Sequence, residues 1–406
     1  MNCRICNNKD IKEFLSLGNI ALTNSFVSEK DLNKKEETYP LDICFCQVCK
    51  LVQLKHAVPP ELLFKHYLYV SSVSPTFKSH LTKMAESLTN EFHLDENSLV
   101  VDIGSNDGLL LKGFKKFGVR TVGVEPATNI AEIAEKDGIE TINDFFNERA
   151  VKKIIDSRGK ADVVTANNVF AHINDLKSVV NNVKKLIKDD GAFVIEAAYI
   201  IDMLQQMTFD LIYHEHLFYY SLTPLNYLFG ENGMEIFKVE HVSSQGGSLR
   251  VYIRKQGAKH PIDQSVPKML ENEKAFGIHD FETYKRFAGR VHDSKDKLYK
   301  CLTEIKNQGK IIVGYGAPAK ATILLSFCNI GKGYIDYIVD NNPLKQGTYT
   351  PYFHIPVVPA SMLDKKKPDY ILILAWNFAE EILKNTKKYS DDGVKFIIPL
   401  PEPVIK

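Results

Sequence analysis

One short segment of the chain gathers side chains that could carry acid–base chemistry. Residues 210–220 read Asp-Leu-Ile-Tyr-His-Glu-His-Leu-Phe-Tyr-Tyr, which places His214, Glu215 and His216 side by side among three tyrosines. Histidine can remove a proton near neutral pH, a neighbouring carboxylate could orient it, and a tyrosine could donate to a developing enolate oxygen. A lone histidine is usually structural, so the clustering is what makes His216 a candidate base. The His-x-His pair could also bind a metal, but no third ligand is evident nearby.

Four of the seven cysteines form two Cys-x-x-Cys pairs, Cys3 with Cys6 and Cys46 with Cys49. A gap of two residues lets both thiolates of a pair face one cation, and two pairs complete a tetrahedral shell of four sulfurs. Such a closed shell is structural, and we expect it to hold Zn²⁺ in preference to iron, with Cys44 as a less well-spaced substitute ligand. A redox pair is one alternative, and the presence of two pairs argues against it. A zinc ribbon that binds nucleic acid is the other, but the segment lacks a basic stripe interleaved with aromatic residues.

A glycine turn between a strand and a helix is expected at residues 98–108, Ser-Leu-Val-Val-Asp-Ile-Gly-Ser-Asn-Asp-Gly. The next strand, expected at 120–124, ends in Glu125, whose carboxylate could accept both ribose hydroxyls of an adenosine. Asp102 and Asp107 lie near the turn, where their charges would repel a pyrophosphate. A cationic sulfonium with an amino-acid tail suits them better, which favours S-adenosylmethionine over a dinucleotide. Because a glycine turn alone is weak evidence, this prediction depends on its combination with Glu125 and the ordered strand ends.

Later strand ends supply the rest of the expected crevice, because ligands of open parallel sheets bind at the carboxyl ends of the strands. Residues 143–146, Asn-Asp-Phe-Phe, could flank the adenine, and the strand expected at 161–166 leads into Asn167 and Asn168. The predicted cofactor-binding residues are Asp102, Gly104, Ser105, Asn106, Asp107, Gly108, Glu125, Pro126, Asn143, Phe145, Phe146, Asn167 and Asn168.

The elements that must position these residues belong to a chain of 406 residues, which is too long for one ordinary domain of about 100–200 residues. We expect an α/β protein with a small zinc-binding domain at 1–70, a central Rossmann-like class I methyltransferase domain at 71–256 and a C-terminal Rossmann-like α/β domain at 281–406. The segment 256–280 mixes proline, glycine and charge, and is predicted to be a connection. A long helix is expected at about 284–307. Further strands are expected near 310–314, 334–340, 369–374 and 394–398.

Composition argues against several function classes. The net charge is +1, so no overall field would recruit nucleic acid or an anionic membrane. No apolar run reaches the roughly 18–20 residues that span a bilayer, and the N-terminus lacks a signal-peptide pattern. We therefore expect a cytoplasmic protein with no nucleic-acid or membrane partner, either a monomer or a homodimer.

Several motifs together resemble those of the bacterial sugar C-methyltransferases, which act on nucleotide-linked deoxy-keto-sugars in antibiotic and surface-glycan pathways. The resemblance covers nearly the whole chain. Besides the two cysteine pairs, the motifs are residues 67–75 (YLYVSSVSP), 102–108 (DIGSNDG), 168–172 (NVFAH), 213–216 (YHEH), 246–250 (GGSLR), 314–320 (GYGAPAK) and 339–347 (VDNNPLKQG).

The resemblance implies a zinc-binding N-terminal domain, a central S-adenosylmethionine domain and a C-terminal Rossmann-like domain that closes over the nucleotide-sugar. It implies that His216 is the base, and that the other catalytic residues, Tyr67, His172, Tyr213 and Glu215, line the sugar pocket. The function it implies is C-methylation of a nucleotide-diphosphate-linked keto-deoxy-sugar after removal of the proton beside the ketone. The alternatives are an O- or N-methyltransferase on another small molecule and a zinc-ribbon nucleic-acid-binding protein.

A second glycine loop is expected at residues 310–320, Lys-Ile-Ile-Val-Gly-Tyr-Gly-Ala-Pro-Ala-Lys. Backbone N–H groups and the helix dipole there could hold phosphate. We therefore predict that Gly316 and Lys320 contact the nucleotide diphosphate of the sugar. His214, in the segment 210–220, is a further predicted substrate-binding residue. Asp340 ends the next strand, where a dinucleotide site places its ribose-binding acid, but the third glycine of that fingerprint is missing. A scaffold or dimerisation domain is the main alternative, and an NAD site is disfavoured.

Overall fold

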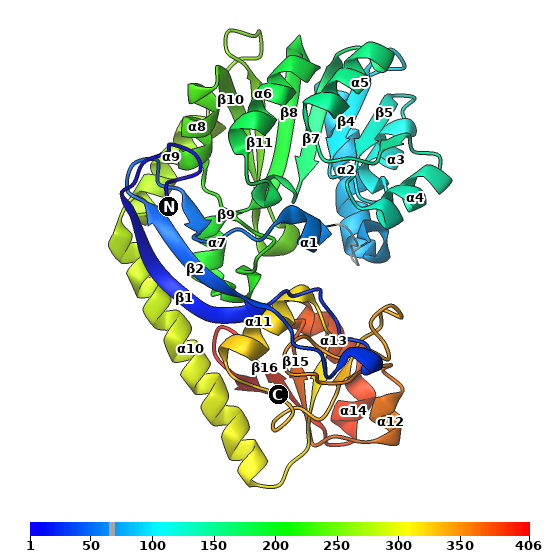
Figure 1. Cartoon of the computed structure of the whole chain (residues 1–406), viewed down its shortest axis with the longest axis vertical. Helices are drawn as coiled ribbons and strands as arrows, with labels where there is room; N and C mark the ends of the chain where they lie inside the picture. Colours follow the sequence, from blue (N-terminus) through cyan, green and yellow to red (C-terminus); the bar gives the residue numbers. More distant parts are fainter. Residues whose placement is uncertain (65–69) are drawn as a thin grey trace.

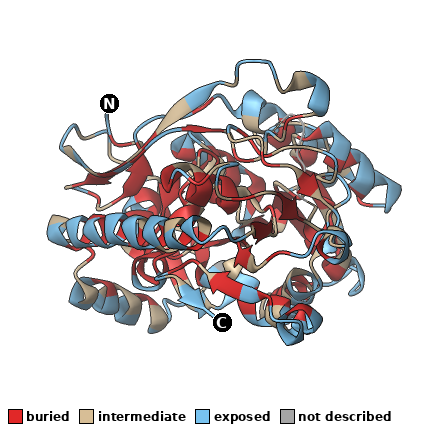
Figure 2. Ribbon diagram, turned by 90° about the horizontal axis from the view of Figure 1, so that it is seen from below, coloured by how far each residue is buried: buried red, intermediate tan, exposed pale blue. Residues whose placement is uncertain are grey.

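The computed structural model describes residues 1–64 and 70–406, with the exception of the side chain of Gln245. Three sheets organise these residues: a four-stranded sheet near the N-terminus, a seven-stranded central sheet and a six-stranded C-terminal sheet. In Figure 1 the central sheet lies at the top and the C-terminal sheet at the bottom, and the long strands of the first sheet run between them. Buried residues concentrate in the strands, whereas the outer faces of the helices are exposed (Figure 2). The predicted α/β architecture is confirmed.

The N-terminal sheet is antiparallel and includes one strand from the middle of the chain. Its strands lie in the order β1 (Ile11–Ala21), β2 (Thr38–Cys46), β3 (Val52–Leu54) and β9 (Phe218–Tyr219). The β9 strand begins two residues after His216, so the candidate catalytic segment is hydrogen-bonded into the sheet that carries the cysteines. The short helix α1 (Pro60–Phe64) follows β3 along the chain.

The strands of the central sheet are parallel except for one strand next to an edge, which runs opposite to both of its neighbours. The strand order is β10-β11-β8-β7-β4-β5-β6, and every residue of β4 is buried, as expected for a parallel strand covered on both faces. The strands are β4 (Leu99–Ile103), β5 (Arg120–Val124), β6 (Thr141–Ile142), β7 (Ala161–Asn167), β8 (Ile187–Ala198), β10 (Met234–Val242) and β11 (Ser248–Lys255). The strands predicted at 98–103, 120–124 and 161–166 are confirmed.

Between residues 75 and 255, seven of the described helices precede or separate the strands of this sheet along the chain. They are α2 (Pro75–Glu91), α3 (Leu109–Lys115), α4 (Thr128–Lys136), α5 (Glu148–Arg158), α6 (Leu176–Leu186), α7 (Ile200–Gln206) and α8 (Leu222–Glu231). The sequence fixes where α2 begins, because Ser74 is its N-cap and accepts a hydrogen bond from the Phe77 N–H, and Pro75 stands at the first helical position.

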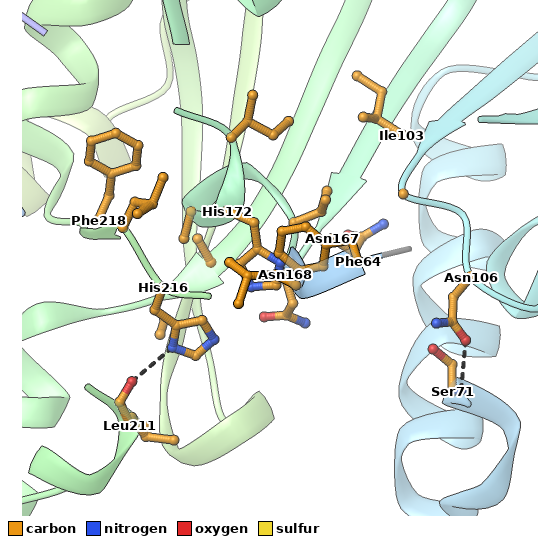
Figure 3. Close-up of a pocket in the computed structure, with 18 of the residues that line it drawn as sticks. Phe64, Ser71, Ile103, Asn106, Asn167, Asn168, His172, Leu211, His216 and Phe218 are labelled. Atoms are coloured by element: carbon orange, nitrogen blue, oxygen red, sulfur yellow. Dashed lines mark hydrogen bonds between the residues drawn. The ribbon is translucent and has the colours of Figure 1, made fainter. Parts of the chain in front are cut away.

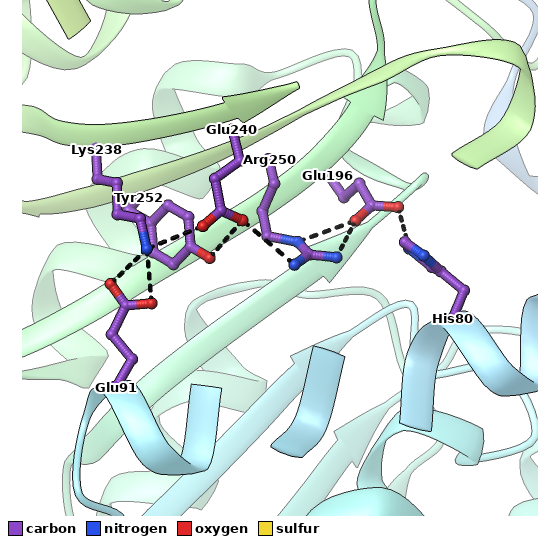
Figure 4. A network of polar contacts seen from close by, with 7 residues as sticks. All are labelled: His80, Glu91, Glu196, Lys238, Glu240, Arg250 and Tyr252. Atoms are coloured by element: carbon purple, nitrogen blue, oxygen red, sulfur yellow. Dashed lines mark hydrogen bonds and ion pairs between the residues drawn. The ribbon is translucent and has the colours of Figure 1, made fainter. Parts of the chain in front are cut away.

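A row of alternating charges ties α2 to the far strands of the central sheet (Figure 4). At one end Glu91 and Glu240 both lie 2.9 Å from the Lys238 ammonium. At the other end the carboxylate of Glu196, fully buried on β8, contacts Arg250 at 2.9 Å and His80 Nε2 at 2.7 Å. Because α2 also carries Phe77 and Leu81 into the central cavity, the network holds one wall of that cavity in place.

The C-terminal sheet is parallel except for its last strand. Its order is β14-β13-β12-β15-β16-β17. The strands are β12 (Ile312–Tyr315), β13 (Ile338–Val339), β14 (Val357–Val358), β15 (Tyr370–Ile373), β16 (Lys395–Ile398) and β17 (Val404–Ile405). The helices are α11 (Ala319–Phe327), α12 (Met362–Lys365), α13 (Ala379–Asn385) and α14 (Lys387–Asp391). The four strands predicted for this region correspond to β12, β13, β15 and β16.

The segment 256–280 is not only a connection, because it contains the helix α9 (Ser265–Phe276). Its apolar residues pack on the core, and its buried Glu273 accepts hydrogen bonds from the backbone N–H groups of Leu222 and Thr223 at the start of α8. The helix α10 (Phe281–Asn307) then runs along one side of the lower half of the molecule, beside β1, and leads into the C-terminal domain (Figure 1). It begins three residues before the predicted long helix. None of the described helices combines the length and the apolar composition needed to span a membrane.

Candidate active site

A cavity of about 370 Å³ opens at the carboxyl ends of the parallel strands of the central sheet. Its lining comes from the ends of β4, β5, β7 and β8, from α1 and α2, and from the segment between α7 and β9. Figure 3 shows how Asn106 and Ser71 lie at one end and His172 and His216 at the other. The cavity therefore joins the predicted cofactor residues to the predicted catalytic residues.

Two buried carboxylates mark the cofactor end. Asp102 accepts a hydrogen bond of 2.6 Å from the Thr165 hydroxyl, and Glu125 accepts backbone N–H bonds of 2.9 Å from Asn106 and Ala127. Burial raises the pKa of the Asp102 carboxyl to about 7 and also raises the pKa of Glu125. Among the described residues neither carboxylate has a cationic partner. The site therefore suits a ligand that brings a positive charge and hydroxyl groups, as S-adenosylmethionine does.

Glycines bring the neighbouring loops close to this end. Gly104 has a φ of +64°, and a Cβ atom there would lie 2.6 Å from the Cγ2 atom of Val169. Gly108 has a φ of +73° and would place a Cβ atom 2.8 Å from Ile139. Both conformations strain residues with side chains, so the turn needs glycine for its backbone and for its packing.

The remaining predicted cofactor residues divide into those that line the cavity and those that build its walls. Ser105, Asn106, Pro126, Phe145, Phe146, Asn167 and Asn168 line it together with Asp102, Gly104 and Glu125. Asp107, Gly108 and Asn143 are not among the lining residues. Asn143 donates to the backbone oxygens of Glu125 and Pro126 instead.

The segment after residues 65–69 is fastened to the glycine turn by two side chains. The Ser71 N–H donates to Asn106 Oδ1 at 2.9 Å (Figure 3), and the Ser72 N–H donates to Asp107 Oδ2 at 3.2 Å. Asp107 therefore positions the wall above the cofactor end. The predicted catalytic residue Tyr67 lies outside the described residues.

The acceptor end of the cavity holds two histidines and a tyrosine. The rings of His172 and His216 stack with centroids 5.2 Å apart, and Tyr213 lies against His216 at 4.0 Å. His216 Nδ1 lies 2.9 Å from the Leu211 carbonyl oxygen (Figure 3). A carbonyl only accepts, so Nδ1 carries the proton and Nε2 keeps its lone pair. Burial lowers the pKa of His216 to about 4 and holds the pKa of His172 well below its usual value.

His214 and Glu215 are buried but do not line the cavity. His214 Nε2 lies 3.1 Å from the Tyr39 carbonyl oxygen, and Glu215 accepts a hydrogen bond of 2.7 Å from the Asn24 amide. Both partners belong to the N-terminal part of the chain. The structure thus places these two residues where they secure the catalytic segment to the neighbouring domain.

Gly316 and Lys320 do not reach this cavity either. The Lys320 ammonium lies 3.8 Å from the Asp210 carboxylate and 4.3 Å from the ring centroid of Trp376. Asp340, which directly follows β13, accepts hydrogen bonds from the backbone N–H groups of Ala317 and Asn342. It therefore holds the second glycine loop against the end of β13. The acid that matched a ribose-binding position is engaged by the protein's own backbone.

The four predicted metal ligands are brought together. The thiol sulfurs of Cys3, Cys6, Cys46 and Cys49 all lie within 4.8 Å of one another, with separations of 3.4 Å for Cys3–Cys49 and 3.5 Å for Cys6–Cys46. Zn–S bonds of about 2.3 Å in a tetrahedron require sulfurs roughly 3.8 Å apart, which this set approaches. Cys44 is buried but stands outside the group, so the two pairs alone provide the four ligands.

Several functional groups carry no signal in the sequence. The Leu211 carbonyl fixes the tautomer of His216, but any residue type offers a carbonyl. Thr165 and Ser71 act on Asp102 and Asn106 from other segments of the chain. A buried threonine in the middle of a predicted strand is ordinary, and only its spatial neighbour gives it a role.

The chain matches three family models that together span most of its length. They are a zinc-binding domain at residues 3–64, a methyltransferase domain at 77–239 and a C-methyltransferase C-terminal domain at 243–401.

The chain is also similar to known proteins. The chain is 36% identical over 401 residues to the C-methyltransferase NovU of Streptomyces niveus, which covers 99% of this chain and 96% of that protein. A ubiquinone biosynthesis O-methyltransferase of Rhodopseudomonas palustris (strain BisA53) is 32% identical over 100 residues, which is 24% of this chain and 38% of that enzyme. The structure of magnesium protoporphyrin IX methyltransferase (ChlM) from Synechocystis PCC 6803 with bound S-adenosylmethionine covers 44% of this chain and 79% of its own, at 13% identity and a TM-score of 0.34.

The full-length match to NovU and the three family models confirm the predicted family and both predicted cofactors. The chain belongs to the C-methyltransferase family, and it is an S-adenosylmethionine-dependent enzyme with a structural zinc site.

Proposed function

We propose that the enzyme methylates the carbon beside the ketone of a nucleotide-diphosphate-linked keto-deoxy-sugar, with His216 as the base. The observation that carries this proposal is the hydrogen bond from His216 Nδ1 to Leu211, which leaves Nε2 able to accept a proton inside the cavity. The same cavity extends to Asp102 and Glu125, so a base and a cofactor site share one enclosed space.

In this reaction the protein must make the carbon beside the ketone nucleophilic and hold it next to a methyl donor. When bound, S-adenosylmethionine supplies an electrophilic methyl group, and Asp102 and Glu125 are the residues that would hold it. A ketone acidifies the C–H bond beside it, and Nε2 of His216 takes that proton while the electron pair moves toward the ketone oxygen. The reacting atoms must lie within about 3–3.5 Å for the subsequent carbon attack, which also requires that competing water be kept away from them.

Burial of His216 is compatible with this role. Its pKa of about 4 keeps the ring neutral near pH 7, so the base form is the form present. Proton removal from a neutral sugar carbon creates a positive imidazolium and a negative enolate together. Their attraction in a cavity of low dielectric offsets the cost of charging a buried ring.

Hydrogen-bond donors for the enolate oxygen stand beside the base. His172 Nε2 is buried and has no hydrogen-bond partner within the described residues, and the same is true of Asn168 Nδ2. Native proteins rarely leave buried polar atoms unsatisfied, so these atoms favour an acceptor rich in oxygen. Asn168 also has a φ of +55°, a strained conformation that is often found at functional sites. A neutral His172 can still donate one N–H.

Product analysis tests the proposed function. The purified enzyme would be incubated with labelled S-adenosylmethionine and dTDP-, GDP- and CDP-linked 4-keto-6-deoxy sugars, and the products examined by mass spectrometry and NMR. We expect one added methyl group on a carbon beside the ketone of one panel member. Methylation on oxygen, or no transfer to any member despite tight cofactor binding, would contradict the keto-sugar assignment.

A further inference from the structure

The segment that carries the candidate base is held by two other domains. On one side, Tyr39 and Asn24 of the N-terminal domain contact His214 and Glu215. On the other side, α11 of the C-terminal domain packs against the short helix Phe209–Leu211, with the rings of Phe209 and Phe327 5.6 Å apart. The geometry of the base thus depends on residues far away in the chain.

The C-terminal contact centres on one carboxylate. Asp210 is completely buried, and its Oδ2 accepts a hydrogen bond of 2.6 Å from the Trp376 indole N–H. The Lys320 ammonium lies 3.8 Å from the same oxygen and 4.3 Å from the centre of the Trp376 ring. Burial raises the pKa of Asp210, and the Lys320 charge and the indole donor limit this rise by favouring the carboxylate.

The contacts of Asp210 with Lys320 and Trp376 lie next to the carbonyl group that orients the base. Leu211 follows Asp210, and its carbonyl oxygen accepts the His216 Nδ1–H bond at 2.9 Å. A buried ion pair contributes little net stability compared with apolar residues of the same size. Its placement next to Leu211 is better explained by what it holds in position.

We propose that Lys320 and Trp376 are positioning residues for His216: by fixing Asp210 they fix the Leu211 carbonyl, so that Nδ1 keeps its proton and Nε2 faces the substrate. The C-terminal domain therefore takes part in proton removal without touching the reacting atoms. This inference rests on the proposed function, in which His216 is the base.

The role predicted for Lys320 from the sequence, contact with the nucleotide diphosphate, has a different kinetic signature. A residue that binds the diphosphate changes KM for the nucleotide-sugar, whereas a residue that aligns the base changes kcat. Trp376 separates the two roles further, because its indole N–H is directed at Asp210.

The test compares Trp376→Phe, which removes the N–H and keeps an aromatic ring, with Lys320→Met, which removes the charge. Lys320→Arg keeps the charge and should restore most of the activity. Lys295→Met is a matched control, because Lys295 lies over the Phe327 ring at 4.6 Å in the same region and has no contact with Asp210. Misalignment of catalytic groups by about 1 Å can lower the rate a hundredfold. We expect kcat to fall by about tenfold to a hundredfold in the first two variants, with KM and the cofactor Kd within about twofold of wild type.

A second measurement needs no substrate. The ¹⁵N chemical shifts of the His216 ring distinguish the Nδ1–H from the Nε2–H tautomer, and the signals can be assigned by their loss in His216→Asn. We expect wild type and Lys295→Met to show the Nδ1–H form, and Trp376→Phe and Lys320→Met to show a mixture.

Three results would overturn the inference: unchanged kcat in both variants, a raised KM with unchanged kcat, or unchanged His216 signals. Thermal unfolding checks that each variant folds. If Lys320→Met does not fold, Lys320→Gln takes its place as the variant without the charge. If wild type methylates no sugar but the ¹⁵N signals shift as expected, then the proposed substrate is wrong and the positioning role stands.

Discussion

His216 and Leu211 are joined by a hydrogen bond that decides which ring nitrogen can accept a proton. The Nδ1 atom lies 2.9 Å from the carbonyl oxygen, so the lone pair is on Nε2, and the ring lies next to the rings of Tyr213 and His172 in the cavity. The four residues between the two partners place donor and acceptor within one local turn. The backbone of this loop therefore sets the tautomer, and we propose that Asp210, held by Lys320 and Trp376, keeps that backbone in position.

Cofactor binding should depend on pH through Asp102. Its pKa of about 7 lies above the ordinary value, so the free enzyme holds a proton there at pH 6 and has lost it at pH 8. A cationic cofactor favours the carboxylate, so binding should strengthen as the pH rises. Competition with a proton of pKa 7 predicts about a tenfold lower Kd at pH 8 than at pH 6, measured by calorimetry.

The control for this dependence is Asp102→Asn, which cannot titrate. We expect it to bind S-adenosylmethionine more weakly and with a flatter pH dependence. In the ligand-free protein the sign reverses: because the folded pKa is raised, the stability associated with Asp102 is present at low pH and is lost as the pH rises through 7. An identical pH dependence of binding in wild type and variant would show that Asp102 does not face the cofactor.

Gly104→Ala should disrupt the cofactor end more than a comparable change elsewhere. The new Cβ atom would meet Val169 at 2.6 Å, and φ is +64°. Strain and overpacking together should cost about 2–4 kcal/mol and weaken cofactor binding, because Val169 belongs to the loop that carries Asn168 and His172.

Gly118→Ala is the matched control, because Gly118 has a φ of +81° but open space around its Cβ position. It should show only the backbone strain, about 1–2 kcal/mol, with unchanged cofactor binding. Urea unfolding and calorimetry measure both quantities. Equal effects of the two substitutions would contradict the packing role of Gly104.

The N-terminal cysteines should hold one Zn²⁺ per chain. Cys46→Ser removes one of four converging thiolates and should release the metal, as measured by elemental analysis, and lower the melting temperature. The destabilisation should extend to the catalytic segment, because β9 pairs with β3 of the same sheet.

Cys44→Ser tests whether the effect belongs to the metal. Cys44 is buried on the same strand but lies outside the ligand group, so this variant should keep its zinc. Loss of zinc from Cys44→Ser with retention in Cys46→Ser would reverse the assignment.

Arg250→Met should destabilise the protein by about 3–5 kcal/mol, since it leaves the buried Glu196 carboxylate without its main cation. Although burial opposes it, His80 and Arg250 lower the pKa of Glu196 in the folded state. The contribution of this carboxylate is therefore present above its unfolded pKa and is lost as the pH falls through the folded value. Chemical unfolding gives the free energy of unfolding of Arg250→Met and of the double variant Glu196→Gln/Arg250→Met. The double variant should be more stable than Arg250→Met, because it has no buried carboxylate at position 196. If the two variants are equally stable, the loss in Arg250→Met does not come from an uncompensated charge.

The sequence predicted those features that depend on local order. The buried strand 98–103, the glycine turn and Glu125 are consecutive, and the carboxyl ends of parallel strands meet at one edge, so Asp102, Glu125 and Asn168 could be placed together. The metal-binding cysteine pairs could also be predicted from the sequence, because a spacing of two residues between the thiols defines the local geometry.

Features that depend on contacts between distant segments could not be predicted in this way. His214 and Glu215 share the catalytic motif with His216, yet they face Tyr39 and Asn24, because consecutive side chains on this loop point in different directions. Lys320 follows a phosphate-binding type of loop, but its neighbour Asp210 comes from another domain. The helix α9 was missed because its apolar face is narrow and its central contact is made by a buried glutamate.

The most direct test of the account is proton exchange at the carbon beside the ketone. Wild type and His216→Asn would be incubated in D₂O with the keto-sugar and S-adenosylhomocysteine, so that no methyl group is available, and deuterium incorporation followed by NMR. We expect wild type to incorporate deuterium at that single position, and the variant to be slower by about a hundredfold to ten-thousandfold while it still binds the cofactor product. Exchange at the wild-type rate in folded His216→Asn would show that His216 is not the base.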